Sequence, residues 1–157
     1  MNLTSTADGG IELHLEHQAE WLMVASILHD ANRPGFDLAA AVGARMADTE
    51  DWEDWSEWVL PDLREGFQQH LRTVAAAIEV GAQQGFIQPG TVVIPRDAFF
   101  DWYAALNQAR LALESKYQFG QKSRIETEDT PTKRGAAHFR SQFYNFLQAH
   151  LLDRGLG

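Results

Sequence analysis

The chain has 157 residues, enough for one domain, and no cysteine, which excludes a disulfide scaffold, a thiolate zinc site and cysteine-based catalysis or redox sensing. Its formal net charge of −9 argues against broad binding to nucleic acid or to an anionic membrane, because both need basic surface. No apolar run approaches the roughly 20 residues that cross a bilayer, and no signal peptide is visible. We therefore expect a single cytoplasmic domain over residues 1–157.

The N-terminal part is predicted to hold one strand and two helices. Residues 1–10 end in an Asp-Gly-Gly turn signal and are interpreted as a flexible lead-in. Ile11–Leu15 alternates apolar and polar residues, which is the period of a half-buried strand. Residues 20–30 are apolar on most sides, which indicates a central helix, and a shorter helix is expected over residues 36–46.

An acidic segment with evenly spaced tryptophans follows at residues 48–65. The segment contains eight carboxylates and a single arginine, so most of the negative charge of the chain lies here. Trp52, Trp55 and Trp58 recur every three residues, which places them on one side of a helix. Two interpretations stay open. Either the tryptophans pack in the core beneath a solvated acidic face, which we favour, or they form a partner-binding surface, because Trp is enriched at interface hot spots.

The centre of the chain is predicted to contain two long helices and a short strand. From Pro61 to Gly81, apolar residues recur at spacings of three and four, the pattern of a core-facing helix. Residues 91–94 are β-branched, which predicts a strand, and its economical partner is Ile11–Leu15. Residues 96–117 then form the clearest amphipathic helix. Its apolar stripe is Phe99, Trp102, Leu106, Ala109, Leu113 and Tyr117.

The C-terminal part is predicted to be a loop and a last helix. Residues 121–134 are polar and aperiodic, so a loop is expected, and residues 136–153 regain a helical period. The inward side of this helix is predicted to carry Phe139, Phe143, Phe146, Leu147, His150 and Leu151. The sequence as a whole predicts a mainly α fold: a single-domain bundle of about five helices with a small two-stranded β pairing.

Histidine and carboxylate residues suggest two weak metal sites. His29-Asp30 follows an apolar helix and resembles the metal-binding dipeptide of helical HD-type phosphohydrolases, but a divalent ion needs more ligands than these two. The simpler interpretation is a His-Asp pair that ends a helix. His14, His17 and Glu20 share a three-residue spacing, yet the predicted strand takes His14 out of helical register, so surface residues are favoured there.

A basic concentration surrounds the polar loop, with Lys133, Arg134 and Arg140 as its C-terminal members. It is a candidate anion or DNA patch, but the sequence lacks a helix-turn-helix with a basic recognition helix, so nucleic-acid binding is not expected. The sequence also lacks the G-x-S-x-G motif, the P-loop and the Gly-rich dinucleotide turn. We therefore predict no cofactor and no enzymatic activity.

Two polar residues lie beside the stripe of the 96–117 helix, Asn107 and Arg110. An arginine at the edge of a core must be paired and hydrogen-bonded, because an unpaired buried charge costs several kcal/mol. Either Arg110 ties this helix to an acidic residue or to carbonyl groups of a neighbouring helix, which we favour, or it binds an anionic ligand in a cleft.

The run from Trp102 to Leu113, WYAALNQARLAL, resembles the W-x-x-A-L-N-D-x-R-L-A-L run of an uncharacterised bacterial family, domain of unknown function 2017. The resemblance extends over about the last seventy residues. The family is best known from actinobacteria, where its members are often encoded beside the ClpS protease adaptor, and some are described as transcriptional or oxidative-stress regulators. Gln108 departs from the acidic residue of the family run, and the absence of cysteine excludes a thiol switch in this chain.

The resemblance implies a regulatory or adaptor-like protein that acts through protein–protein contacts. With the acidic, tryptophan-bearing segment, it leads us to expect a protein partner and a homodimer, without membrane association. The alternatives are a metal-dependent hydrolase centred on His29 and Asp30 and a DNA-binding regulator that uses Lys133 and Arg134.

Overall fold

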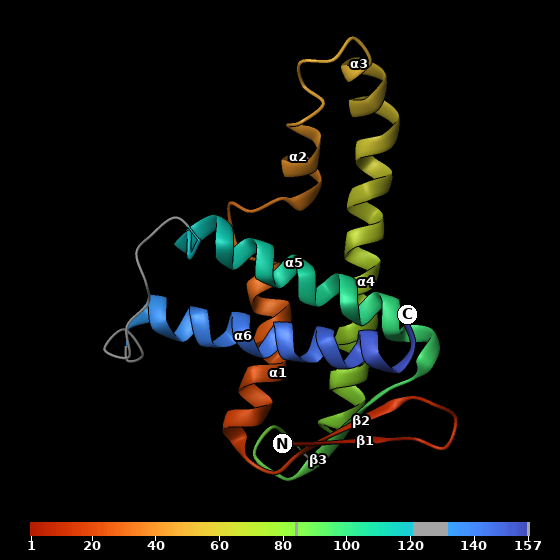
Figure 1. Ribbon diagram of the computed structural model, residues 1–157, viewed down its shortest axis with the longest axis vertical. Coiled ribbons are helices and arrows are strands. Elements are labelled where there is room, and N and C mark those ends of the chain that lie inside the picture. Colours follow the sequence, from red (N-terminus) through yellow and green to blue (C-terminus); the bar gives the residue numbers. More distant parts are fainter. Residues whose placement is uncertain (84, 121–131, 157) are drawn as a thin grey trace.

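A computed structural model of the chain describes residues 1–83, 85–120 and 132–156. The mainly α fold with about five helices is confirmed (Figure 1). The helices are α1 (Gln18–Ala31), α2 (Leu38–Gly43), α4 (Leu60–Gly81), α5 (Phe99–Tyr117) and α6 (Lys133–Leu151), with α3 (Trp52–Asp54) as one short turn. A π-helical segment, Trp55–Val59, joins α3 to α4; a 3-10 turn, Arg96–Ala98, leads into α5; and a second π-helical segment, Leu152–Leu156, follows α6.

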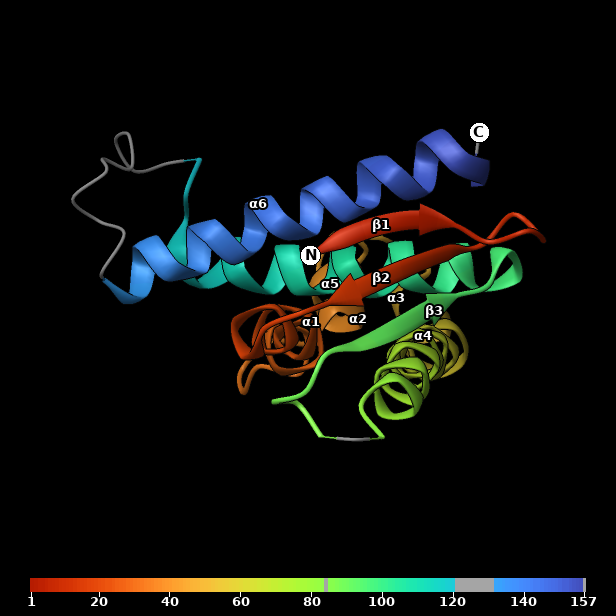
Figure 2. The same cartoon turned by 90° about the horizontal axis from the view of Figure 1, so that it is seen from below.

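A three-stranded antiparallel sheet closes one end of the molecule (Figure 2), in the order β1 (Asn2–Ser5), β2 (Ile11–Leu15) and β3 (Gly90–Ile94). The predicted pairing of β2 with β3 is confirmed, with Leu13 opposite Val92. The prediction of a flexible lead-in over residues 1–10 is wrong for β1. Leu3 lies opposite Leu13 and packs against the core, so burying it stabilises the third strand.

Helix α5 lies at the centre of the core and packs against α1, α4 and α6. Its predicted stripe is buried except for Tyr117, which is half-buried, and Trp102, Leu106 and Leu113 are completely shielded from solvent. From α1, Trp21, Val24 and Ile27 meet this stripe. The helices α1, α4, α5 and α6 therefore share one core. This core fixes the position of α1 relative to α6.

A close approach between α4 and β3 depends on a glycine. A Cβ on Gly81 would lie 2.6 Å from the carbonyl oxygen of Thr91 and 3.0 Å from Val92 Cγ2. Glycine normally weakens a helix interior, and here its lack of a side chain lets the end of α4 contact the backbone of the strand.

The last helix begins earlier and faces differently than predicted. Thr132 is its N-cap and accepts a hydrogen bond from the Gly135 N–H at 3.0 Å, so residues 132–134 do not belong to the loop; residues 121–131 lie outside the described residues. The inward assignment is wrong for Phe139 and Phe146, which are exposed. The buried residues of α6 are Gly135, Ala137, Tyr144, Leu147, Gln148 and Leu151. Its inward face thus includes two polar side chains, Tyr144 and Gln148, that the predicted inward face lacks.

An arm made of α2, α3, the π-helical segment and the first half of α4 extends away from the sheet (Figure 1). The Asp37 side chain caps α2 by accepting a hydrogen bond from the Ala40 N–H at 3.0 Å. Asp37 also accepts one from Arg64 Nε of α4 at 2.9 Å, which links the two helices of the arm at its base.

Candidate functional site

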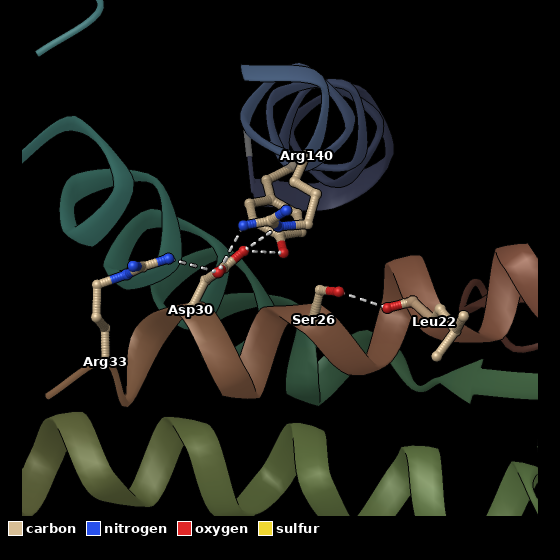
Figure 3. Close-up of polar contacts among 6 residues, drawn as sticks. Leu22, Ser26, Asp30, Arg33 and Arg140 are labelled. Atoms are coloured by element: carbon tan, nitrogen blue, oxygen red, sulfur yellow. Dashed lines mark hydrogen bonds and ion pairs between the residues drawn. The ribbon is translucent and has the colours of Figure 1, made fainter. Parts of the chain in front are cut away.

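A buried polar cluster joins the C-terminal end of α1 to α6 (Figure 3). Asp30 is 0% exposed, and its two carboxylate oxygens accept four contacts. Arg140 donates from Nε to Oδ2 at 2.7 Å and from Nη2 to Oδ1 at 3.1 Å. The Tyr144 hydroxyl donates to Oδ2 at 2.7 Å, and Arg33 Nη2 lies 3.4 Å from Oδ1. Asp30 is therefore the anchor that fixes the first half of α6 on α1.

The surroundings of this cluster keep its donors protonated. The hydrogen bond from Arg140 to Asp30 raises the pKa of the Arg140 guanidinium. Burial, and then the charge of Asp30, raise the pKa of the Tyr144 phenol well above its usual range. A carboxylate has about four lone-pair sites, and four donated contacts leave Asp30 without a free one. The cluster therefore serves as internal framework and leaves no coordination position on Asp30 for a metal.

The histidines singled out in the sequence lie apart from one another. His29 is exposed next to Asp30, and His14 on β2 contacts the hydroxyls of Thr4 at 2.8 Å and Thr91 at 3.1 Å. Glu20 accepts a hydrogen bond from the His17 N–H at 3.3 Å and pairs with the N-terminal ammonium group. Within the part of the chain that the structure describes, no group of three or more His, Cys, Asp or Glu side chains is placed to hold a metal ion.

Arg110 reaches across to α6, but its acceptor there is a glutamine side chain and not the acidic residue or backbone carbonyl groups that the favoured interpretation named. Its Nη1 donates to Gln148 Oε1 at 2.6 Å, and Gln148 Nε2 donates in turn to the Tyr103 carbonyl at 3.2 Å. This chain of hydrogen bonds ties α5 to α6 at their middles. Asn107 and Arg110 also line a surface hollow of about 150 Å³, together with Leu111, Glu114 and Ser141.

The acid–tryptophan tip, residues 48–62, forms the far end of the arm (Figure 1). None of its three tryptophans is buried, so the favoured interpretation of them as core residues is wrong. Trp52 and Trp55 stack with ring centroids 5.9 Å apart, and Trp55 covers Gly43 of α2 so closely that a Cβ there would lie 2.6 Å from its ring. Trp58 stays 68% exposed. The acidic residues of the tip, all exposed, are Asp48, Glu50, Asp51, Glu53, Asp54, Glu57 and Asp62.

The π-helical segment explains why the three tryptophans separate. A three-residue spacing keeps side chains on one face of an α-helix, but wider π-helical turns rotate successive residues differently. Trp52 lies in α3 and Trp55 begins the π-helical segment, whereas Trp58 lies near its end and is exposed. The result is one indole that contacts solvent among carboxylates, on a surface that contains no basic residue from 48 to 62.

The structure divides the predicted basic patch. Lys133 is exposed in the first turn of α6, and the Arg134 guanidinium lies over the Phe119 ring at 5.7 Å. Arg140, by contrast, is committed to Asp30. The sequence alone did not identify Arg33 and Tyr144 as partners of Asp30. The spacing of Tyr144, Gln148 and Leu151 by four and three residues was the available signal that polar residues face inward on α6.

In a comparison with known families, the family described as "Domain of unknown function (DUF2017)" matches residues 24–154. The chain belongs to this family. The matched range includes α1 from its second turn, the whole arm, α5 and α6, and therefore both the Asp30 cluster and the acid–tryptophan tip. Neither the curated proteins nor the solved structures give a match. None of the helices in the described residues combines the length and apolarity needed to cross a membrane.

Proposed function

We propose that this protein is a regulatory or adaptor-like protein that binds a partner protein through the acid–tryptophan tip, and that it does so as a homodimer without catalysing a reaction. The observation that carries the proposal is Trp58, which is 68% exposed at the end of an arm. A large indole left in water is unfavourable unless another surface covers it, because aromatic side chains contribute much of the burial energy at interfaces.

The charge around Trp58 indicates the chemistry of the partner. Seven exposed carboxylates without a basic residue among them attract a basic surface and accelerate its association. The indole then supplies the apolar anchor that a purely electrostatic contact lacks. The partner surface that fits is therefore a Lys- or Arg-rich region with an apolar pocket wide enough for one indole ring.

The resemblance to a family with members described as regulators supports a role in transcriptional or stress regulation, and the cytoplasm is the compartment that we propose for it. The arm suits such a role because the acid–tryptophan tip lies at its far end, away from the sheet (Figure 1). Asp37 and Arg64 join α2 to α4 within the arm, and Trp58 and the seven carboxylates of the tip are exposed. Binding at the tip therefore does not require the core to open.

The test compares the wild type with Trp58→Ala in affinity capture from native cells, with Phe100→Ala as the matched control. Phe100 is 62% exposed on α5, so the control removes an aromatic side chain of similar exposure from a different surface. A protein recovered with the wild type and the control but not with Trp58→Ala is then purified, and its dissociation constant is measured at 50 and 300 mM NaCl.

We expect Trp58→Ala to raise the dissociation constant at least about 10-fold, as at an interface hot spot. We also expect binding of the wild type to weaken at the higher salt, because exposed charges are screened. Equal affinity of the wild type and Trp58→Ala, or affinity independent of salt, would contradict the proposal.

A further inference from the structure

A hollow of about 390 Å³ lies where the loop after α1 faces the end of α5. One wall is formed by residues 33–36, and the other by Ala112, Ser115 and Lys116 in the last two turns of α5. Pockets that hold small molecules measure about 300–1,000 Å³, so this hollow has room for one small ligand. It shares no residue with the acid–tryptophan tip.

Two cationic side chains line this hollow, Arg33 and Lys116, and none of its described lining residues is acidic. Both cations lie against the ring of Tyr117. Arg33 Cζ is 5.5 Å and Lys116 Nζ is 5.4 Å from the ring centroid, distances at which a cation is attracted to an aromatic ring. One ring thus holds two positive charges beside the same hollow, in a chain whose net charge is −9.

The charge of Arg33 is weakly compensated inside the protein. Its hydrogen bond to Asp30 Oδ1 measures 3.4 Å, whereas Arg140, which reaches Asp30 from a different side (Figure 3), binds that carboxylate at 2.7 and 3.1 Å. The buried Nε of Arg33 has no hydrogen-bond partner in the part of the chain that the structure describes. A guanidinium carries five N–H donors, and leaving them without acceptors is unfavourable. Arg33 is therefore short of negative partners.

Lys116 is also without a carboxylate. Among the described residues its charge contacts only the Tyr117 ring. Two acidic residues are close in sequence, but neither lines the hollow. Asp37 pairs with Arg64 at 2.9 Å, and Glu114 lines the separate hollow beside Arg110. An anion in the hollow would therefore meet two cations and no competing carboxylate.

We propose that this hollow binds a small phosphate monoester, with the phosphate group between Arg33 and Lys116. Together with Arg140, these side chains supply three positive charges against the one carboxylate of Asp30, which leaves an excess of about two. A phosphate monoester carries a charge of about −1.5 to −2 at pH 7 and matches this excess, whereas a carboxylate supplies one charge. The arginine fork suits phosphate oxygens, and lysine adds a point charge.

The other walls of the hollow suit the rest of such a ligand. Ser115 is exposed at the hollow, and its hydroxyl is a donor for a third phosphate oxygen. Phe36 and Ala112 provide apolar contact for the organic group of the ester. Inorganic phosphate would use the polar contacts alone, so an ester should bind more tightly. The inference concerns the body of the molecule and does not rest on the proposed function.

The experiment is an NMR titration of the ¹⁵N-labelled full chain at pH 7 and 50 mM NaCl, with phenyl phosphate, inorganic phosphate and benzoate as separate probes. We expect phenyl phosphate to bind with a dissociation constant of about 1 mM or below and to shift the amide signals of Gly35, Ser115 and Lys116. Benzoate, with the same ring but a single charge, should bind at least about 10-fold more weakly. Inorganic phosphate, which lacks the ring, should bind at least about 3-fold more weakly.

Two variants remove the cations one at a time. Lys116→Gln and Arg33→Gln should each raise the dissociation constant of phenyl phosphate at least about 10-fold, because a charge-assisted hydrogen bond is lost. Arg45→Gln is the matched control: it changes the net charge equally at an exposed arginine that does not line the hollow, and it should leave binding unchanged. Circular dichroism verifies folding, and the exposed Lys116 carries the test if Arg33→Gln does not fold.

Three results would overturn the inference. The first is a titration to 10 mM phenyl phosphate that leaves the amide signals of residues 33–36 and 112–116 in place. The second is equal affinity for phenyl phosphate and for either of the other two probes. The third is a folded Lys116→Gln variant that binds phenyl phosphate like the wild type. Trp58→Ala should bind phenyl phosphate normally, so this inference and the proposed function fail separately.

Discussion

Removing Arg140, the main partner of the buried Asp30 carboxylate, should lower the free energy of unfolding far more than breaking a similar ion pair at the surface. Arg140→Leu deletes two of the four contacts of Asp30, at 2.7 and 3.1 Å, and leaves a carboxylate that is 0% exposed with only Tyr144 and a distant Arg33. Breaking a buried pair costs about 3–5 kcal/mol, and the partial exposure of the Arg140 side chain places this case near about 3 kcal/mol.

The matched control is Arg64→Leu, which breaks the Arg64–Asp37 pair at 2.9 Å with both side chains nearly half exposed. Such a surface pair contributes less than about 1 kcal/mol. Urea unfolding at pH 7 measures both free energies. In a domain of this size 1 kcal/mol shifts the melting temperature by about 2–4 °C, so Arg140→Leu should melt about 6–12 °C below the wild type.

A double variant separates loss of the pair from loss of packing. Asp30→Asn combined with Arg140→Leu removes the unpaired charge while the amide oxygen still accepts from Tyr144, so it should be more stable than Arg140→Leu alone. If Arg140→Leu costs no more than Arg64→Leu, or if the added Asp30→Asn gives no recovery, the cluster is not the framework described above.

Two further predictions concern α4 and α6. Gly81→Ala should destabilise the protein by about 1–3 kcal/mol despite the better helix propensity of alanine, because its Cβ would lie 2.6 Å from the Thr91 carbonyl oxygen. Gly66→Ala should instead stabilise the protein by about 0.5–1 kcal/mol, because nothing lies within 4 Å of the added Cβ. Equal effects of the two glycine variants in urea unfolding would refute this reasoning. The raised pKa of Tyr144 means that, above pH 10, the folded state retains a proton that the unfolded state loses. Its contribution to stability is therefore complete below pH 10 and declines as pH rises above it. The stability difference between the wild type and Tyr144→Phe should narrow from pH 8 to pH 11, and a constant difference would argue against ionisation at this site.

Local patterns predicted most of the secondary structure because each pattern reflects one element facing one core. The alternation in Ile11–Leu15 and the period of three and four in residues 96–117 both follow directly from strand and helix geometry. The pairing of β2 with β3 was also predicted, because two short strands need partners. The strand β1 was missed because a single half-buried apolar residue, Leu3, gives no period to detect.

The polar cluster needed the tertiary structure. Asp30 and Arg140 are 110 residues apart, and no local pattern relates them until the core of α5 has placed α1 against α6. This pair bears on two hypotheses. Asp30 was a candidate metal ligand and Arg140 a candidate member of an anion or DNA patch, and the two side chains bind each other.

The sequence by itself determined the mainly α class, the family, and the concentration of negative charge and tryptophan in residues 48–65, because composition and periodicity are properties of the chain alone. The tertiary structure decided which aromatic side chains remain in water. Trp58 turns outward through a π-helical segment, and Phe139 is exposed because Tyr144 and Gln148 occupy the inward face of α6. Both outcomes depend on how one helix is rotated against its neighbours, and that rotation is fixed by packing between distant parts of the chain.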